Sequence, residues 1–239
     1  VYAQATAHAH ARAVVVPARD FGHDLDAMRA AIGEDTQLVF VANPNNPTGS
    51  FIEPAPLEAF LQSVPAHVTV LLDEAYTEYL APAQRYDSIG WVRRLPNLIV
   101  ARTFSKAFGL AGLRIGYGVA QPALAARMNA QRPRFNVTTP ALAAATAALG
   151  DADFLARSYE LNTAGRAQLA AGFDELGLAH LPSSGNFLMV KVGDSAAVHA
   201  RLLAAGIEVS LLGNYGLGEW LRISVGLPEQ NRALLAALR

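Results

Sequence analysis

The sequence predicts an α/β protein: a mostly parallel sheet with helices on both faces, followed by a smaller α+β layer. Short runs that are apolar throughout alternate with helical patterns over the first 150 residues. Strands of a parallel sheet that is buried on both faces have this character. The pattern changes near Asp151, where a long helical segment begins. We therefore expect a large domain over residues 1–150, and a linking helix with a small C-terminal domain over residues 151–239.

The first half contains four runs expected to form strands: Ala13–Pro17, Leu38–Ala42, Val68–Leu72 and Leu98–Ala101. Leu25, Met28 and Ile32 fall at helical spacing between the first two runs. A fifth run, Ile115–Val119, follows Lys106–Arg114 too closely for a long crossover helix. We therefore expect it to lie antiparallel to its neighbour.

The second half is expected to begin with one helix from Asp151 to Gly177. Its predicted packing face consists of Leu161, Leu169, Phe173 and Leu176. The elements expected after it are a strand (Phe187–Val192), a helix (Ser195–Ala205), two strand candidates (Ile207–Leu212 and Trp220–Val225) and a closing helix from Pro228. The glycine-rich segment Leu212–Gly218 is expected to form a hairpin or loop.

Composition excludes several classes of protein. The 239 residues carry 19 basic and 20 acidic side chains, a net charge of −1, which provides no field for nucleic acid or an anionic membrane. Hydrophobic residues make up 52% and charged residues 16%, which excludes disorder. There is no cysteine, hence no disulfide or cysteine metal site, and this fits a cytoplasmic protein. Scattered histidines, with His8 and His10 flanking one alanine, do not predict a metal site.

Two candidate ligand-binding segments follow strands. Asn43–Gly49, N-P-N-N-P-T-G, comes directly after an apolar run, and ligands bind at the carboxyl ends of strands in open α/β sheets. Asn46 offers an amide to a ligand there, although the loop alone is also compatible with a plain turn. Asp73 leaves an apolar strand and requires a cation or proton donor, which a protonated ring nitrogen would supply. Tyr76 follows three residues later; a helix N-cap or a structural ion pair is the alternative.

A third cluster surrounds Lys106. A lysine at a strand end in apolar surroundings can act as an amine nucleophile, because burial lowers its pKa. Thr103, Ser105 and Arg114 suit a phosphate. Solvated surface for the lysine and tight packing for the nearby glycines are the alternatives. Arg222 lies within a strand of the second half, where it would grip a carboxylate or form a structural salt bridge.

In combination, these segments resemble the fold-type I pyridoxal-phosphate aminotransferases, and most closely their histidinol-phosphate branch. The motifs that carry the resemblance are N-P-N-N-P-T-G, D-E-A-Y, T-F-S-K-A-F-G-L-A-G-L-R-I-G-Y and W-L-R-I-S-V-G. They occur in this order, and the resemblance runs from Val1 to Arg239. It implies a homodimeric enzyme that transfers an amino group from a small-molecule donor to a 2-oxoacid such as 2-oxoglutarate, with pyridoxal 5′-phosphate as cofactor.

The resemblance also implies a role for each site residue. Lys106 would bond covalently to the cofactor and carry the proton to and from the substrate Cα. Asp73 would hold the ring nitrogen protonated, and Asn46 and Tyr76 would bind the phenolic oxygen. Thr103, Ser105 and Arg114 would bind the cofactor phosphate. Arg222, with Asn46, would bind the substrate. The habit of the family also predicts a cis Asn46–Pro47 bond.

The chain departs from the family pattern in two places. It opens at Val1, after the family's N-terminal arm, phosphate-binding backbone loop and ring-stacking aromatic, so we expect an N-terminal part to be absent. At Ser210 the histidinol-phosphate branch has an arginine for the substrate phosphate. The open alternatives are an aromatic or neutral amino-acid aminotransferase, a decarboxylase or lyase of the same fold, and an inactive truncated domain.

Overall fold

The computed structural model describes residues 2–239. Its helices are α1 (Tyr2–His8), α2 (Leu25–Ala30), α3 (Pro54–Ser63), α4 (Ser88–Arg94), α5 (Pro122–Ala130), α6 (Thr139–Leu149), α7 (Ala152–Glu175), α8 (Ser195–Ala204) and α9 (Pro228–Leu238). Its strands are β1 (Leu38–Ala42), β2 (Thr69–Asp73), β3 (Leu98–Thr103), β4 (Gly116–Val119), β5 (Phe187–Lys191), β6 (Ser210–Leu211) and β7 (Trp220–Ser224). Short 3₁₀ turns are η1 (Thr77–Tyr79), η2 (Pro82–Gln84), η3 (Ala111–Leu113) and η4 (Gly213–Tyr215).

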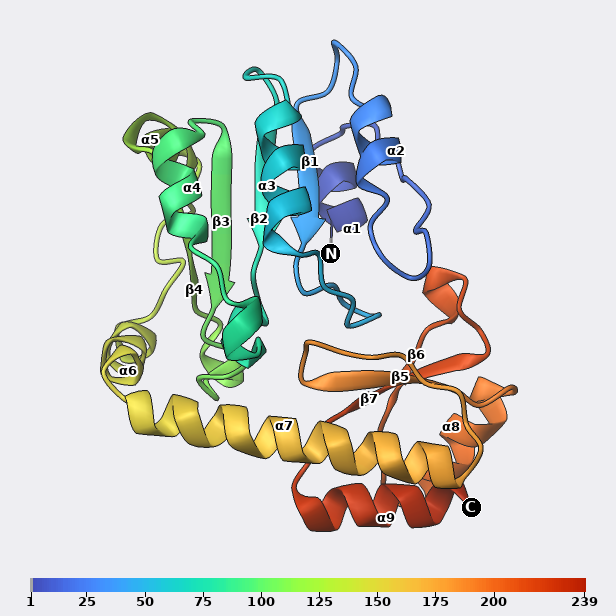
Figure 1. Ribbon diagram of the computed structural model, residues 1–239. Coiled ribbons are helices and arrows are strands. Elements are labelled where there is room, and N and C mark those ends of the chain that lie inside the picture. The colour runs from blue at the N-terminus through green and yellow to red at the C-terminus, as the bar shows by residue number, and fades with distance from the viewer. Residues whose placement is uncertain (1) are drawn as a thin grey trace.

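The first sheet has the order β1-β2-β3-β4 (Figure 1). The first three strands are parallel and β4 is antiparallel to β3, as the sequence predicts. Ala42 lies opposite Asp73, and Asp73 lies opposite Ala101 on the next strand. The carboxyl ends of three parallel strands therefore meet at one edge, which places the segments after them close together.

Helices lie on both faces of this sheet. α2, α3 and α4 cover one face, where Leu57, Phe60 and Trp91 pack against Val70 and Val100 in one buried core. Val70 and Leu72 of β2, and Leu98 and Val100 of β3, belong to this core and alternate along their strands, as one face of a pleated sheet requires. On the other face, Tyr2 of α1 stacks on Phe40 of β1 with 4.7 Å between ring centroids. The sequence prediction of a mostly parallel, helix-covered sheet is confirmed.

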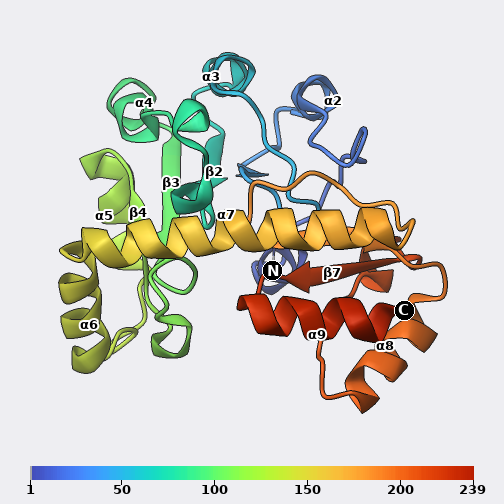
Figure 2. The same ribbon diagram turned by 60° about the horizontal axis from the view of Figure 1, so that its bottom comes forward.

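The second sheet has the order β5-β7-β6 and is antiparallel throughout. Helices α7, α8 and α9 share its core, in which Leu169 and Phe173 of α7 meet Leu221 and Ile223 of β7. The long helix α7 extends from the side of the first sheet to the second, as both views show (Figures 1 and 2). Because α7 contacts η1 as well as β5 and α9, the division into domains 1–150 and 151–239 stays a prediction.

Three expectations about elements are wrong. Ala13–Pro17 is not a strand: Val14 and Val15 are 59% and 80% exposed, and the run pairs with no strand in residues 2–239. An apolar triplet satisfies the strand pattern, but burial requires a neighbour, and β1 pairs only with β2. The strand expected over Ile207–Leu212 is reduced to the two residues of β6.

Leu161 is the third error, because it is 54% exposed and lies off the packing face of α7. The buried positions before Leu169 are Asn162 and Gly165. A side chain at Gly165 would collide with Val225, so the helix approaches the second sheet through a glycine. A count of apolar residues misses a face built this way. No helix within residues 2–239 has both the length and the apolar character needed to cross a bilayer.

Candidate active site

A pocket of about 320 Å³ opens at the edge where the parallel strands end. Its size lies at the lower end of the range for small-molecule sites, roughly 300–1,000 Å³. Its lining residues come from the ends of β2 and β3 and the segment after β3: Asp73, Ala75, Ala101, Arg102, Thr103, Ser105, Lys106 and Arg114. The structure therefore brings Asp73, Lys106 and the three predicted phosphate-binding residues to one cavity.

Lys106 is half-buried in this pocket. Burial is the largest cause that lowers its pKa below the usual 10.5; Arg222 and Arg114 lower it further, while Asp73 acts in the opposite direction. Its Nζ lies 5.5 Å from the centre of the Tyr76 ring. Among the described residues no carboxylate forms a salt bridge with it. A larger neutral fraction near pH 8 follows, and the neutral amine is the nucleophilic form.

Asp73 faces the same pocket from the end of β2. Its Oδ1 accepts a hydrogen bond from the Ala75 backbone N–H at 3.0 Å, and its Oδ2 accepts one from the Tyr2 hydroxyl at 2.7 Å. Both donors are neutral, and no salt bridge within residues 2–239 involves this carboxylate. Asp73 is thus available to a cationic group of a ligand.

Thr103, Ser105 and Arg114 form the anion-binding side of the pocket. The Ser105 backbone N–H donates to Thr103 Oγ1 at 3.1 Å, and Arg114 Nη1 donates to Ser105 Oγ at 3.3 Å. Arg114 adopts a left-handed conformation with φ 51° and also donates to the Ala111 carbonyl at 2.8 Å. Such strain in a non-glycine residue is typical of functional sites. The remaining guanidinium donors and two hydroxyls suit a phosphate.

Arg222 reaches the site from the second sheet. Its Nη1 donates to Asn46 Oδ1 at 2.7 Å, and Asn46 Nδ2 donates to the Tyr76 hydroxyl at 3.3 Å. The three predicted residues therefore form one chain of hydrogen bonds. Burial is the main cause that raises the pKa of Tyr76; Asp73 also raises it, whereas Arg222 and Asn46 lower it.

Two further contacts fix the guanidinium of Arg222. Ser210, its cross-strand neighbour on β6, accepts from Nη2 at 3.0 Å. The ring of Phe187 lies 5.3 Å from Arg222 Cζ. Arg222 Nε is buried and has no partner within residues 2–239. A buried donor on a charged group that has no hydrogen-bond partner costs free energy.

The loop Asn43–Gly49 holds Asn46 against the second sheet. Gly49 has φ 76°, and a side chain there would collide with Ser183, so glycine allows the two segments to touch. The Gly49 carbonyl accepts a hydrogen bond from the Ser184 backbone N–H at 2.9 Å. The cis Asn46–Pro47 bond is confirmed, and Asn43–Pro44 is also cis, which the sequence reasoning did not predict.

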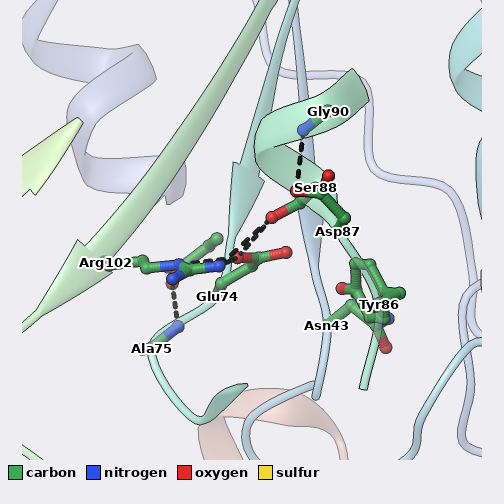
Figure 3. Close-up of polar contacts among 9 residues, drawn as sticks. Asn43, Glu74, Ala75, Tyr86, Asp87, Ser88, Gly90 and Arg102 are labelled. Atoms are coloured by element: carbon green, nitrogen blue, oxygen red, sulfur yellow. Dashed lines mark hydrogen bonds and ion pairs between the residues drawn. The ribbon is translucent and has the colours of Figure 1, made fainter. Parts of the chain in front are cut away.

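Sequence reasoning missed two parts of the site. Tyr2 belongs to no motif, and only the fold shows that it reaches Asp73. A buried cluster around Glu74 was also missed, although strand alternation places Glu74 on the face opposite to Asp73. Glu74 Oε2 accepts from Arg102 Nε and from Ser88 Oγ, each at 2.9 Å (Figure 3). Tyr86 lies beside this cluster, and burial and Glu74 raise its pKa.

Almost the whole chain is similar to proteins of a known family. The sequence profile of the family "Aminotransferase class I and II" matches residues 2–238. Histidinol-phosphate aminotransferase 2 of Ralstonia nicotianae is 62% identical over 100% of this chain and 65% of its own length. Histidinol-phosphate aminotransferase 1 of Cupriavidus pinatubonensis is 61% identical over 100% of this chain and 64% of its own length.

A solved structure shows the same fold. The crystal structure of histidinol-phosphate aminotransferase from Sinorhizobium meliloti in complex with pyridoxal-5′-phosphate has a TM-score of 0.93 and 37% identity. The match covers 99% of this chain and 66% of that one. The chain spans about 65% of the length of the curated relatives it matches.

Proposed function

The chain belongs to the aminotransferase class I and II family, and from this premise we propose that it serves pyridoxal-phosphate-dependent transamination. The observation that carries the proposal is Lys106, whose pKa is lowered within a pocket that also holds Asp73 and a phosphate-binding side. These residues fit the cofactor. The guanidinium of Arg222, which lowers the pKa of Lys106, would bind a substrate oxyanion beside this pocket.

When bound, pyridoxal phosphate supplies an aldehyde carbon and a ring that withdraws electrons from the substrate Cα. Lys106 would provide the amine that holds the aldehyde carbon of the cofactor, with loss of water, and this amine would move a proton at the substrate Cα. Asp73 would bind the protonated ring nitrogen, while Asn46 and Tyr76 would bind the phenolic oxygen. Thr103, Ser105 and Arg114 would hold the phosphate and thereby fix the ring in place.

Arg222 orients the substrate. Its planar guanidinium suits the two oxygens of a carboxylate, and Asn46, Ser210 and Phe187 fix its position. We propose 2-oxoglutarate as the acceptor whose α-carboxylate it binds, and a cytoplasmic homodimer as the assembly. The lack of cysteine supports the compartment, and exposed Leu142 and Leu149 on α6 support an interface.

Histidinol phosphate is the proposed donor, because the relatives at 62% and 61% identity carry that name. The second candidate is an unphosphorylated aromatic or neutral amino acid. Ser210 favours it, since a neutral hydroxyl stands beside Arg222 where a second cation would help bind a phosphate.

The first test is covalent labelling. The chain, with the N-terminal part that the family resemblance leads us to expect restored, is incubated with pyridoxal phosphate, reduced with borohydride and mapped by peptide mass. The label should lie on Lys106 and be lost in Lys106→Ala, whereas Lys191→Ala, which removes the other lysine, retains it. A label on Lys191 alone would contradict the assignment.

The second test concerns the reaction. Histidinol phosphate, histidinol, phenylalanine, tyrosine and leucine are each supplied with 2-oxoglutarate. Formation of glutamate without release of carbon dioxide supports transamination. Release of carbon dioxide without glutamate would instead indicate a decarboxylase, and labelled but inert protein would contradict the proposed reaction.

A further inference from the structure

Tyr2 lies outside every motif of the site and yet contacts its central acid. We propose that Tyr2 is a positioning residue, whose phenol holds the Asp73 carboxylate in the orientation that receives a protonated ring nitrogen. The inference rests on the proposed function, because the ring nitrogen belongs to the cofactor.

The contacts of Asp73 carry the inference. Oδ2 accepts from the Tyr2 hydroxyl at 2.7 Å, and Oδ1 accepts from the Ala75 backbone N–H at 3.0 Å. One donor on each oxygen fixes the rotation of the carboxylate about its Cβ–Cγ bond. A carboxylate offers about four lone-pair sites, so two donors leave room for a third. Asp73 is therefore oriented but not saturated.

Tyr2 is itself held firmly enough to act in this way. Its ring stacks on Phe40 with 4.7 Å between centroids and an interplanar angle of 14°. Phe40 lies on β1, which pairs with β2. The ring that supports the phenol and the carboxylate of Asp73 therefore come from neighbouring strands. Burial, and secondarily Asp73, raises the pKa of Tyr2 far above its usual value near 10. The hydroxyl therefore keeps its proton, and remains a donor, to a higher pH than a free phenol does.

A neutral donor suits this position better than a cation. Arg102 neutralises Glu74 on the other face of the sheet, and a cation at Tyr2 would neutralise Asp73 in the same way. The phenol fixes the geometry of Asp73 and leaves its negative charge for the ligand. A hydrogen bond to a charged group also contributes more than a neutral one.

The test compares Tyr2→Phe with the unchanged chain by titrating two cofactors and following the absorbance of lysine-bound cofactor. Affinity for pyridoxal phosphate should fall, because binding must then also orient the Asp73 carboxylate; one hydrogen bond to a charged group, roughly 10- to 150-fold, is the upper limit of this loss. Affinity for the analogue that has carbon in place of the ring nitrogen should change less than about twofold, because this ring has no N–H to donate to Asp73. Tyr159→Phe on α7 is the matched control and should leave both affinities unchanged.

Equal losses for both cofactors would show that Tyr2 only supports packing, and no loss for either would show that it is irrelevant; either result overturns the inference. A second measurement needs no cofactor. Tyr2→Phe should lower the unfolding temperature by roughly 3–12 °C in the unchanged chain, and by less than half as much in Asp73→Asn. Equal shifts in the two backgrounds would contradict the contact.

The two measurements separate this inference from the proposed function. If the unchanged chain takes up no pyridoxal phosphate, the proposed function fails, and the part of the inference that concerns the ring nitrogen fails with it. The unfolding comparison then still decides whether Tyr2 and Asp73 are coupled. If the unchanged chain binds the cofactor and Tyr2→Phe binds it equally well, only the inference fails.

Discussion

Asp73 and Glu74 are adjacent in the chain but occupy opposite kinds of environment. Glu74 is 0% exposed and meets Arg102 and Ser88 in a closed cluster (Figure 3). Asp73 lines an open pocket, and within residues 2–239 its carboxylate accepts hydrogen bonds from the neutral donors of Tyr2 and Ala75. Removing one partner of a buried ion pair leaves the other charge buried and unpaired, whereas a charge without a counterion is available to a ligand. Because side chains alternate along a strand, the two carboxylates lie on opposite faces of the sheet and meet these different surroundings.

The largest difference between the two acids is expected in stability. Glu74→Gln leaves the half-buried Arg102 without its counterion and should lower the free energy of unfolding by about 3–5 kcal/mol. Asp73→Asn, the matched change on the open side, should lower it by less than about 1 kcal/mol, because the amide oxygen still accepts a hydrogen bond. Urea unfolding of both variants measures the contrast. Similar losses in the two would contradict the distinction between closed and open clusters.

For catalysis we expect the opposite order, with a larger effect of Asp73→Asn than of Glu74→Gln. A neutral amide cannot stabilise a protonated ring nitrogen, so Asp73→Asn should lower the rate of transamination about a hundredfold or more, equivalent to about 2.7 kcal/mol in the transition state. Circular dichroism provides the control for an intact fold. Turnover in Asp73→Asn like that of the unchanged chain would reject the role of Asp73.

A substitution at Ser210 tests how the site around Arg222 recognises a phosphate. Ser210→Arg places a second guanidinium beside Arg222 and should improve affinity for histidinol phosphate roughly 10- to 150-fold, with little change for histidinol. Ser210→Ala is the control, because it removes the hydrogen-bond acceptor without adding charge. Equal improvement for both donors would show that the added arginine does not act on the phosphate.

The smallest expected effect concerns Lys106. Its pKa is lowered by burial, then by Arg222 and Arg114, so Arg114→Gln should raise this pKa and move covalent labelling to higher pH. The lowered pKa of Lys106 also determines how the stability of the fold changes with pH. Between the native pKa of Lys106 and 10.5, the unfolded chain holds more protons, so stability rises with pH across that window. A labelling midpoint that is unchanged in Arg114→Gln would contradict the contribution of Arg114.

The sequence predicts the parts of the site that depend on strand order. Asp73 and Lys106 follow consecutive parallel strands, so topology alone brings them to one edge. Tyr2 could not be found in this way, because its contact with Asp73 depends on how α1 packs against Phe40. A single sequence also does not show which apolar residues are buried in the fold. Val15 has the character of a strand residue but is exposed, and no strand within residues 2–239 pairs with it.

The contact between Asn46 and Arg222 joins positions 176 residues apart in the chain. Such a contact has a high loop-closure entropy, and it can form only after both sheets exist and the loop ending at Gly49 meets Ser183. We therefore expect the contact between Asn46 and Arg222 to form late, whereas Asp73 and Lys106 come together within a short stretch of chain. A ligand that needs this contact would bind only when the chain has folded from end to end.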